Sequence, residues 1–128
     1  MQVKDIMVKN VVSVGPDDAV SQALAKMKRY KINQLLVTNN NELYGMIELR
    51  RVATKDVNPA EIKVSNIATN VAVIDANASI ESLVELLLKS GLRALPVTEN
   101  GQLKGIVSET DIMNVADHFV KGLNMKVS

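Results

Sequence analysis

The stretch GLRALPVTENGQLKGIVSETD, from Gly91 to Asp111, decides how the chain folds. An apolar run is followed by a turn and by a second apolar run, which is typical of a β-hairpin. The stretch ends in Ser108-Glu109-Thr110-Asp111, where the pattern predicts that a strand ends and a helix begins. A hydroxyl and a carboxylate at such a junction suit either a helix cap or a bound ligand.

The same pattern occurs a second time in the chain. The segment Asn33–Thr38 aligns with Arg93–Thr98, and Gly45-Met46-Ile47 aligns with Gly105-Ile106-Val107. The alignment runs without a gap from Asn10 to Val52 of the first copy. Nearer the N-terminus, Val3–Ile6 matches Val64–Ile67 with a slip of one residue. We therefore interpret the chain as two copies of one structural unit.

Each copy is expected to form a strand, a helix, two further strands and a second helix. In the first copy the strands are predicted at Val11–Val14, Leu35–Thr38 and Leu43–Ile47. The first helix is expected to begin after a cap at Asp17 or Asp18. Apolar residues at helical spacing predict three of the helices. They are Val20, Ala23, Leu24 and Met27 in the first helix of the first copy, Ile80, Leu83, Val84 and Leu87 in the first helix of the second copy, and Ile112, Val115, Ala116 and Phe119 in the last helix.

These elements predict a mixed α/β (α+β) fold of two β-α-β-β-α repeats. The predicted boundaries are 1–56 for the first repeat, 57–62 for the linker, 63–120 for the second repeat and 121–128 for the C-terminal tail. The short helix of the first copy is expected from Leu49 to Asp56. A sheet of about three short strands is marginal alone, so we expect the repeats to pack with pseudo-two-fold symmetry around a cleft.

The composition narrows the range of functions. The chain has 128 residues, 47% of them hydrophobic and 23% charged, with a net charge of +1. Its charges are dispersed and only 2% of its residues are aromatic, which argues against nucleic-acid binding. It contains no cysteine, and no apolar run is long enough to cross a bilayer, so we expect a cytoplasmic protein with no membrane partner.

The two copies resemble a tandem pair of cystathionine β-synthase (CBS) domains over roughly Val3 to Phe119. The most specific residues are Gly91–Val97 and Gly105–Asp111, with support from Gly45-Met46-Ile47 in the first copy. The resemblance implies a regulatory module that is not an enzyme. It implies an adenosine-containing ligand, namely AMP, ADP, ATP or S-adenosylmethionine, bound between the repeats as an energy-sensing signal. It also implies a homodimer formed through the repeat helices.

The resemblance assigns roles to residues of the second copy. Asp111 would accept hydrogen bonds from both ribose hydroxyls, and Ser108 and Thr110 would lie near the ribose and phosphate. The backbone of two segments would frame the adenine; these segments comprise Thr69, Asn70, Val71 and Ala72, and Ala94, Leu95 and Pro96. The adenine nucleotide or S-adenosylmethionine is a regulatory ligand in this reading, and no cofactor or metal is expected.

The first copy departs from this pattern. Leu36 stands at the position of Pro96, and Glu48 and Arg51 stand at the positions of Ser108 and Asp111. One functional site per chain is therefore expected. We hypothesise that Arg51 holds the phosphate of the same ligand, followed as candidates by Arg50 and then Lys31.

Each of these residues also has a structural interpretation. Ser108 and Asp111 form a capping-box pattern, which needs no ligand. Arg51 would then pair with Asp111 or Glu48 in the empty protein, and Pro96 would lie on an edge strand.

Leu86-Leu87-Leu88 would either be buried in the core or meet a second chain. The alternative function is a scaffold module that dimerises, binds no small molecule and controls an unidentified partner protein. The sequence leaves open which ligand is bound, which protein is regulated, whether the chain is part of a longer one, and how the dimer is arranged.

Overall fold

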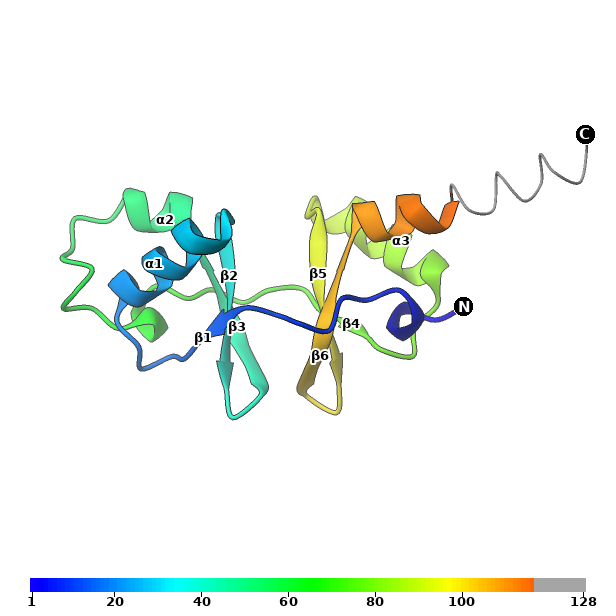
Figure 1. Cartoon of the computed structure of the whole chain (residues 1–128), viewed down its shortest axis with the longest axis horizontal. Coiled ribbons are helices and arrows are strands. Elements are labelled where there is room, and N and C mark those ends of the chain that lie inside the picture. Colours follow the sequence, from blue (N-terminus) through cyan, green and yellow to red (C-terminus); the bar gives the residue numbers. More distant parts are fainter. Residues whose placement is uncertain (117–128) are drawn as a thin grey trace, which may run out of the picture. The chain divides into compact units, whose positions relative to one another are not determined.

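The computed structural model describes residues 1–116, and these form two units (Figure 1). The first-repeat unit comprises Val11–Val71 with Asn100–Leu103. The second-repeat unit comprises Met1–Asn10, Ala72–Glu99 and the chain from Lys104 on. The predicted mixed α/β fold is confirmed, as is the order of strands and helices in both repeats.

The first-repeat unit contains the elements β1 (Ser13–Val14), α1 (Val20–Tyr30), β2 (Gln34–Asn39), β3 (Glu42–Glu48) and α2 (Leu49–Ala53). Strand β2 lies between a parallel β1 and an antiparallel β3. A parallel pair needs a crossover connection, which α1 supplies, and an antiparallel pair needs only a tight turn. That turn contains Asn40 and Asn41, both with positive φ, a conformation that asparagine tolerates better than most residues.

The core of this unit lies between its helices and one face of its sheet. Helix α1 contributes Val20, Ala23 and Met27, whose spacing places them on one side of the helix. Strand β2 contributes Leu35 and Val37, which alternate with residues on the other face. The remaining buried members of the core are Val14, Ile47, Val52, Val64 and Ile67.

The second-repeat unit repeats this arrangement with β4 (Ile74–Asp75), α3 (Ile80–Ser90), β5 (Ala94–Glu99) and β6 (Gln102–Ser108). A helix begins at residue 109 and is described as far as residue 116. Strand β5 pairs in parallel with β4 and lies next to β6. The buried core members are Val3, Ile74, Ala76, Leu83, Leu87, Leu95, Val97 and Val107.

Each unit takes a short 3-10 helix from the start of the other repeat. Val3, in the 3-10 helix η1 (Val3–Asp5), donates its N–H to Ala78 O in the second-repeat unit at 2.9 Å. Val64, in η2 (Val64–Asn66), donates to Asp18 O in the first-repeat unit at 2.9 Å. Both valine side chains are fully buried. The two compact units therefore do not coincide with the two sequence repeats.

The predicted cap of the first helix is wrong. The N-cap of α1 is Ala19, whose N–H donates to the side chain of Gln22 at 3.0 Å. Asp18 accepts a hydrogen bond from Gly15 N at 2.8 Å instead, so its carboxylate closes the preceding turn. A short acidic side chain bonds readily to a nearby backbone N–H, and here the turn competes with the helix for it.

Two predicted elements are shorter in the structure. Helix α2 ends at Ala53, because Thr54 adopts the cap position and its hydroxyl donates to Arg51 O at 2.9 Å. Strand β1 contains only Ser13 and Val14, since the parallel ladder with β2 begins at Ser13. The prediction for Phe119 and the predicted C-terminal tail lie outside the described residues.

Candidate functional site

Ser108 and Asp111 form a reciprocal capping box where β6 ends and the last helix begins. Asp111 Oδ2 accepts from Ser108 N at 2.8 Å and from the Ser108 hydroxyl at 3.0 Å. The Ser108 hydroxyl oxygen accepts in turn from Asp111 N at 3.3 Å. The helix-capping interpretation of this motif is therefore confirmed.

The cap uses only part of the hydrogen-bonding capacity of Asp111. Its second carboxylate oxygen, Oδ1, accepts no hydrogen bond from residues 1–116. Asp111 and Ser108 are half-buried and Thr110 is exposed. A carboxylate has about four lone-pair sites, so Asp111 retains capacity for further donors while it caps the helix.

The backbone fixes this junction in the same way in both repeats. Glu109 N donates to Arg93 O at 2.9 Å, and at the equivalent place Leu49 N donates to Asn33 O at 2.9 Å. Each bond ties the first turn of a helix to the start of the neighbouring strand. The direction in which each helix leaves its sheet is thus set independently of the side chains that differ between the repeats.

The residues expected to frame adenine lie on different elements. Ala94, Leu95 and Pro96 begin β5, and the side chains of Leu95 and Pro96 are fully buried. These two residues are closed to solvent in backbone and side chain alike, and Ala94, which is half-buried, is the accessible part of the segment. Strand β5 lies between β4 and β6, so the edge-strand interpretation of Pro96 is wrong. Ala72 is half-buried and packs against the core of the same unit.

The segment Thr69–Val71 belongs to the first-repeat unit. Thr69 and Met46 exchange two backbone hydrogen bonds, of 2.9 Å from Met46 N and 2.8 Å from Thr69 N. Gly45 permits this contact, because a Cβ atom at its position would lie 2.6 Å from Thr69 O. Asn70 is exposed and Val71 is half-buried. The backbone of Thr69 is thus held against β3, while Asn70 is open to solvent.

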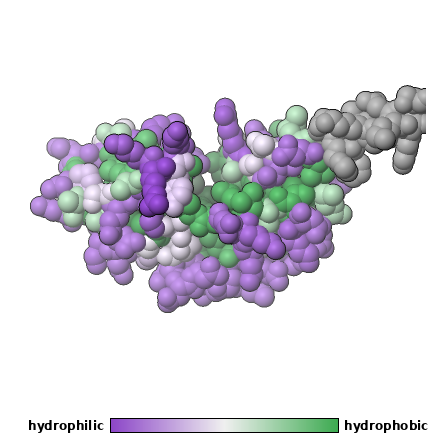
Figure 2. Space-filling view, in the orientation of Figure 1, coloured by the Kyte–Doolittle hydropathy of each residue, from purple (hydrophilic) through white to green (hydrophobic). Residues whose placement is uncertain are grey.

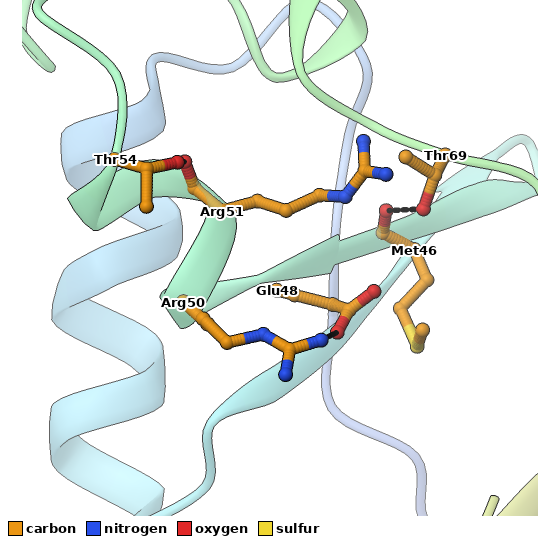
Figure 3. Close-up of polar contacts among 6 residues, drawn as sticks. All are labelled: Met46, Glu48, Arg50, Arg51, Thr54 and Thr69. Atoms are coloured by element: carbon orange, nitrogen blue, oxygen red, sulfur yellow. Dashed lines mark hydrogen bonds and ion pairs between the residues drawn. The ribbon is translucent and has the colours of Figure 1, made fainter. Parts of the chain in front are cut away.

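Two of the three cations expected to hold phosphate, Arg50 and Arg51, lie at the equivalent junction of the first repeat. Glu48 is the N-cap of α2 and makes no side-chain cap. Arg50 approaches Glu48, with 3.9 Å between Arg50 Nη2 and Glu48 Oε2 (Figure 3). Arg51 has no ion pair within 4 Å among the described residues, and its side chain extends away from α2 in Figure 3. The predicted pairing of Arg51 with Glu48 is therefore wrong, since Arg50 takes that place.

Lys31, the third phosphate candidate, follows the last residue of α1. Its backbone is left-handed, with φ of 56°, and its N–H donates to Lys28 O at 3.3 Å. The side chain is exposed. The equivalent position after α3 is Gly91, with φ of 70°. Lys31 thus occupies a helix terminus that is better suited to glycine.

An open hollow of about 490 Å³ lies beside α2 in the first-repeat unit, lined by Asn33, Gln34, Glu48, Leu49, Arg50 and Ala53. Arg50 is the one residue of this lining that the sequence predicts as a ligand contact. Asn33 and Gln34 were not predicted. They are the repeat equivalents of Arg93 and Ala94, and this equivalence is the signal that points to them.

Comparison with known proteins gives a consistent result. The family model described as "CBS domain" matches residues 3–57 and 64–118. Hypoxic response protein 1 of Mycobacterium tuberculosis is 29% identical over 131 residues, which cover 94% of this chain and 92% of that protein. The crystal structure of Hypoxic Response Protein I with two coordinated zinc ions matches this chain with a TM-score of 0.81 and 28% identity. The match covers 89% of this chain and 98% of that one.

Two further solved structures share the fold. A CBS-domain-containing protein from Agrobacterium tumefaciens matches with a TM-score of 0.73 and 30% identity, covering 91% of this chain and 99% of that one. A complex of CBSX2 with AMP matches with a TM-score of 0.77 and 24% identity, covering 92% of this chain and 97% of that one. At this identity the second match concerns the fold alone.

Several curated relatives are longer than this chain. The chain spans 43% of a Methanocaldococcus jannaschii protein at 29% identity and 65% of a Methanopyrus kandleri protein at 26% identity. It matches inosine-5'-monophosphate dehydrogenase of M. jannaschii over only 22% of that enzyme. The shared part is thus a portion of the enzyme and not its whole length.

Among residues 1–116, no three His, Cys, Asp or Glu side chains lie close enough together to hold a metal ion. Within the same residues, every helix is too short or too polar to cross a membrane.

Proposed function

The chain belongs to the CBS-domain family as a tandem pair, and we propose that this regulatory pair binds an adenosine-containing ligand. Asp111 is the residue on which the proposal depends. Its Oδ2 atom is anchored by the capping box, whereas Oδ1 takes no hydrogen bond from the described residues. An ionised acceptor that is already oriented suits the two neighbouring hydroxyls of a ribose.

The other proposed contacts follow the sequence prediction. Ser108 and Thr110 would lie near the ribose and phosphate, and the backbone around Ala94 and Thr69 would frame the adenine. Arg51 would meet the phosphate, in preference to Arg50 and Lys31. The ion pair between Arg50 and Glu48 supports the preference for Arg51 over Arg50, because Arg50 already has an anionic partner. The AMP-bound neighbour is a member of the same fold that holds such a ligand.

We also propose that the chain forms a homodimer through its repeat helices, controls an unidentified regulated protein in the cytoplasm, and is not itself an enzyme. The exposed apolar residues on α3 support the dimer. A regulatory pair needs a protein to regulate, either as a partner or as further sequence in the same chain.

A second function is favoured by the first repeat. Its junction has Glu48 and Arg51 where the second repeat has Ser108 and Asp111, so it lacks the capping box and the oriented carboxylate. A scaffold module that dimerises and binds no small molecule needs no such carboxylate, so its absence from the first repeat would not affect that function.

Thermal unfolding with adenosine, AMP, ADP, ATP and S-adenosylmethionine distinguishes the two functions. A ligand at a hundredfold excess over its Kd stabilises the folded chain by about 2.7 kcal/mol, a shift of several degrees at this size. We expect such a shift with at least one ligand and its loss in the Asp111→Asn variant. No shift with any of the five would favour the scaffold module.

A further inference from the structure

A second hollow, of about 360 Å³, lies within the second-repeat unit, between the start of α3, the last helix and the first residue of the chain. In Figure 2, hydrophobic residues gather over the unit that contains α3. All residues that line the hollow except Glu81 are apolar. We call this set the apolar groove, and its members are Met1, Ile80, Glu81, Ile112, Val115 and Ala116.

The walls of the apolar groove are held in place by the fold of the unit. Gln2 and Ser79 form an antiparallel bridge, so that Met1 and Ile80, the next residues on either side, lie close together. Ser79 also caps α3 by accepting a hydrogen bond from Ser82 N at 3.1 Å. On the opposite wall, Ile112 packs against the core of the same unit. The groove is therefore formed before anything enters it.

The described residues leave the apolar groove open. Met1 is 64% exposed, Ile80, Ile112 and Val115 are half-buried, and Ala116 is exposed. Contact of apolar surface with water is unfavourable, and a hollow lined by such surface is a site that another apolar group fills.

The chain itself supplies such a group directly after the groove. The described part of the last helix ends at Ala116, which is a member of the groove, and the sequence continues as Asp117-His118-Phe119-Val120-Lys121. Phe119 follows Val115 by four residues and Ala116 by three, so helical spacing places it on the apolar side of the last helix. Even as extended chain, Phe119 is within about 10 Å of Ala116.

We propose that the last helix continues beyond Ala116 and that Phe119 of the same chain fills the apolar groove, with its ring between Met1 and Ile80. A buried aromatic ring removes roughly 150–250 Å² from water. A methionine sulfur beside the ring adds a favourable contact, and the flexible side chain of Met1 adapts to its shape. The groove is thus an intramolecular docking site.

This docking bears on the helix that carries Asp111. The capping box of Ser108 and Asp111 holds the first turn of that helix. Phe119 is eight residues further on, about 12 Å along a helix axis. The ring in the groove would therefore hold the opposite end of the same helix, whether or not a ligand binds at Asp111.

Tryptophan fluorescence tests the docking in the full chain, because the chain contains no tryptophan. In Phe119→Trp, we expect emission at a shorter wavelength than from the same variant in urea. Lys121→Trp, on the opposite side of the helix, is the matched control, and acrylamide should quench it several-fold more strongly. Equal quenching of the two variants would overturn the docking.

A second substitution locates the ring. Ile80→Ser, combined with Phe119→Trp, should move the emission to longer wavelength, because Ile80 lines the groove. Leu88→Ser lies on the same helix at a side chain that is 80% exposed and should leave the emission unchanged. The same response to both serine variants would contradict docking in the apolar groove.

Dilution distinguishes the chain's own segment from a second copy. The emission of Phe119→Trp should be independent of concentration, since groove and ring belong to one molecule. A shift to longer wavelength on dilution would assign the groove to a second copy and overturn the proposal.

Phe119→Ala tests the contact without introducing a larger ring. It should lower the midpoint of thermal unfolding by several degrees, whereas Lys121→Ala should leave it nearly unchanged. A Phe119→Ala variant as stable as the wild type would show that the ring is not buried in the groove.

Discussion

The two oxygens of the Asp111 carboxylate have different surroundings. Oδ2 is held by the N–H and the hydroxyl of Ser108 at 2.8 and 3.0 Å, and Oδ1 has no partner among the described residues. A capping box usually contributes about 1 kcal/mol to stability, so the motif would be favourable without any ligand. Capping and ribose binding are compatible because they use different lone pairs of one side chain.

Arg51→Ala tests whether Arg51 of the first repeat binds the phosphate of a ligand whose ribose is held by Asp111 of the second repeat. An arginine on a phosphate makes charge-assisted hydrogen bonds, so its loss should weaken AMP binding about tenfold or more. Adenosine lacks the phosphate and should bind the variant within about twofold of the wild type. Calorimetric titration of both ligands measures the difference.

The control for Arg51 is Lys55→Ala, which removes an exposed cation just beyond α2 and should change neither affinity. Equal losses for AMP and adenosine in Arg51→Ala would contradict a phosphate role.

At the scale of elements, the two repeats end their first helices differently. The residue after α3 is Gly91 at φ of 70°, and the residue after α1 is Lys31 at φ of 56°. Both are left-handed, a conformation that costs a residue with a side chain roughly 1 kcal/mol or more relative to glycine. The first-repeat unit therefore contains a strained terminus that the second-repeat unit avoids.

Lys31→Gly should stabilise the chain by about 0.5–1 kcal/mol, because relief of this strain exceeds the added flexibility of the unfolded chain. Urea denaturation measures it as a higher midpoint. Lys28→Gly, three residues earlier and inside α1, should lower stability by about 1 kcal/mol. If both variants lowered the midpoint equally, the terminal position of Lys31 would not matter.

The sequence was a good guide to regular elements and a poorer guide to their ends. Helical spacing in α1 and α3 and alternation in β2 predicted the right segments, since both patterns follow from burial on one side of an element. The predicted cap at Asp17 or Asp18 was wrong, because the N-cap is Ala19 and the Asp18 carboxylate accepts a hydrogen bond from Gly15 N instead. Helix α2 is short because Thr54 bonds back to Arg51 O.

The candidate site was predictable to a similar degree. Ser108 and Asp111 were identified from their place after a strand, and the structure joins them. The ion pair of Arg50 with Glu48 was not predictable, because adjacent arginines at positions 50 and 51 look alike in a sequence and only the packed junction distinguishes them.

At the scale of the whole molecule, the exchange of the two 3-10 helices links the repeats. The sequence contained a hint of it in the match of Val3–Ile6 with Val64–Ile67. Its structural meaning was not visible, because the hydrogen bonds of Val3 with Ala78 and of Val64 with Asp18 join residues far apart in the sequence. The start of each repeat completes the core of the other unit.

Val3→Ala should therefore destabilise the second-repeat unit by about 2 kcal/mol although Val3 lies near the N-terminus. The side chain is fully buried with Leu83 and Val97 in one core. Thermal unfolding measures the loss, and Val8→Ala, at a valine that is 46% exposed, is the control with a smaller expected effect. A Val3→Ala variant as stable as the wild type would contradict the proposed role of η1.

The most direct test of ligand recognition is a calorimetric cycle that combines Asp111→Asn with loss of one ribose hydroxyl. In the wild type, 2'-deoxyadenosine should bind roughly tenfold more weakly than adenosine, since a hydrogen bond to a charged group is lost. In Asp111→Asn both ligands should bind weakly and nearly equally. An undiminished preference for adenosine in the variant would contradict the assignment of the ribose to Asp111.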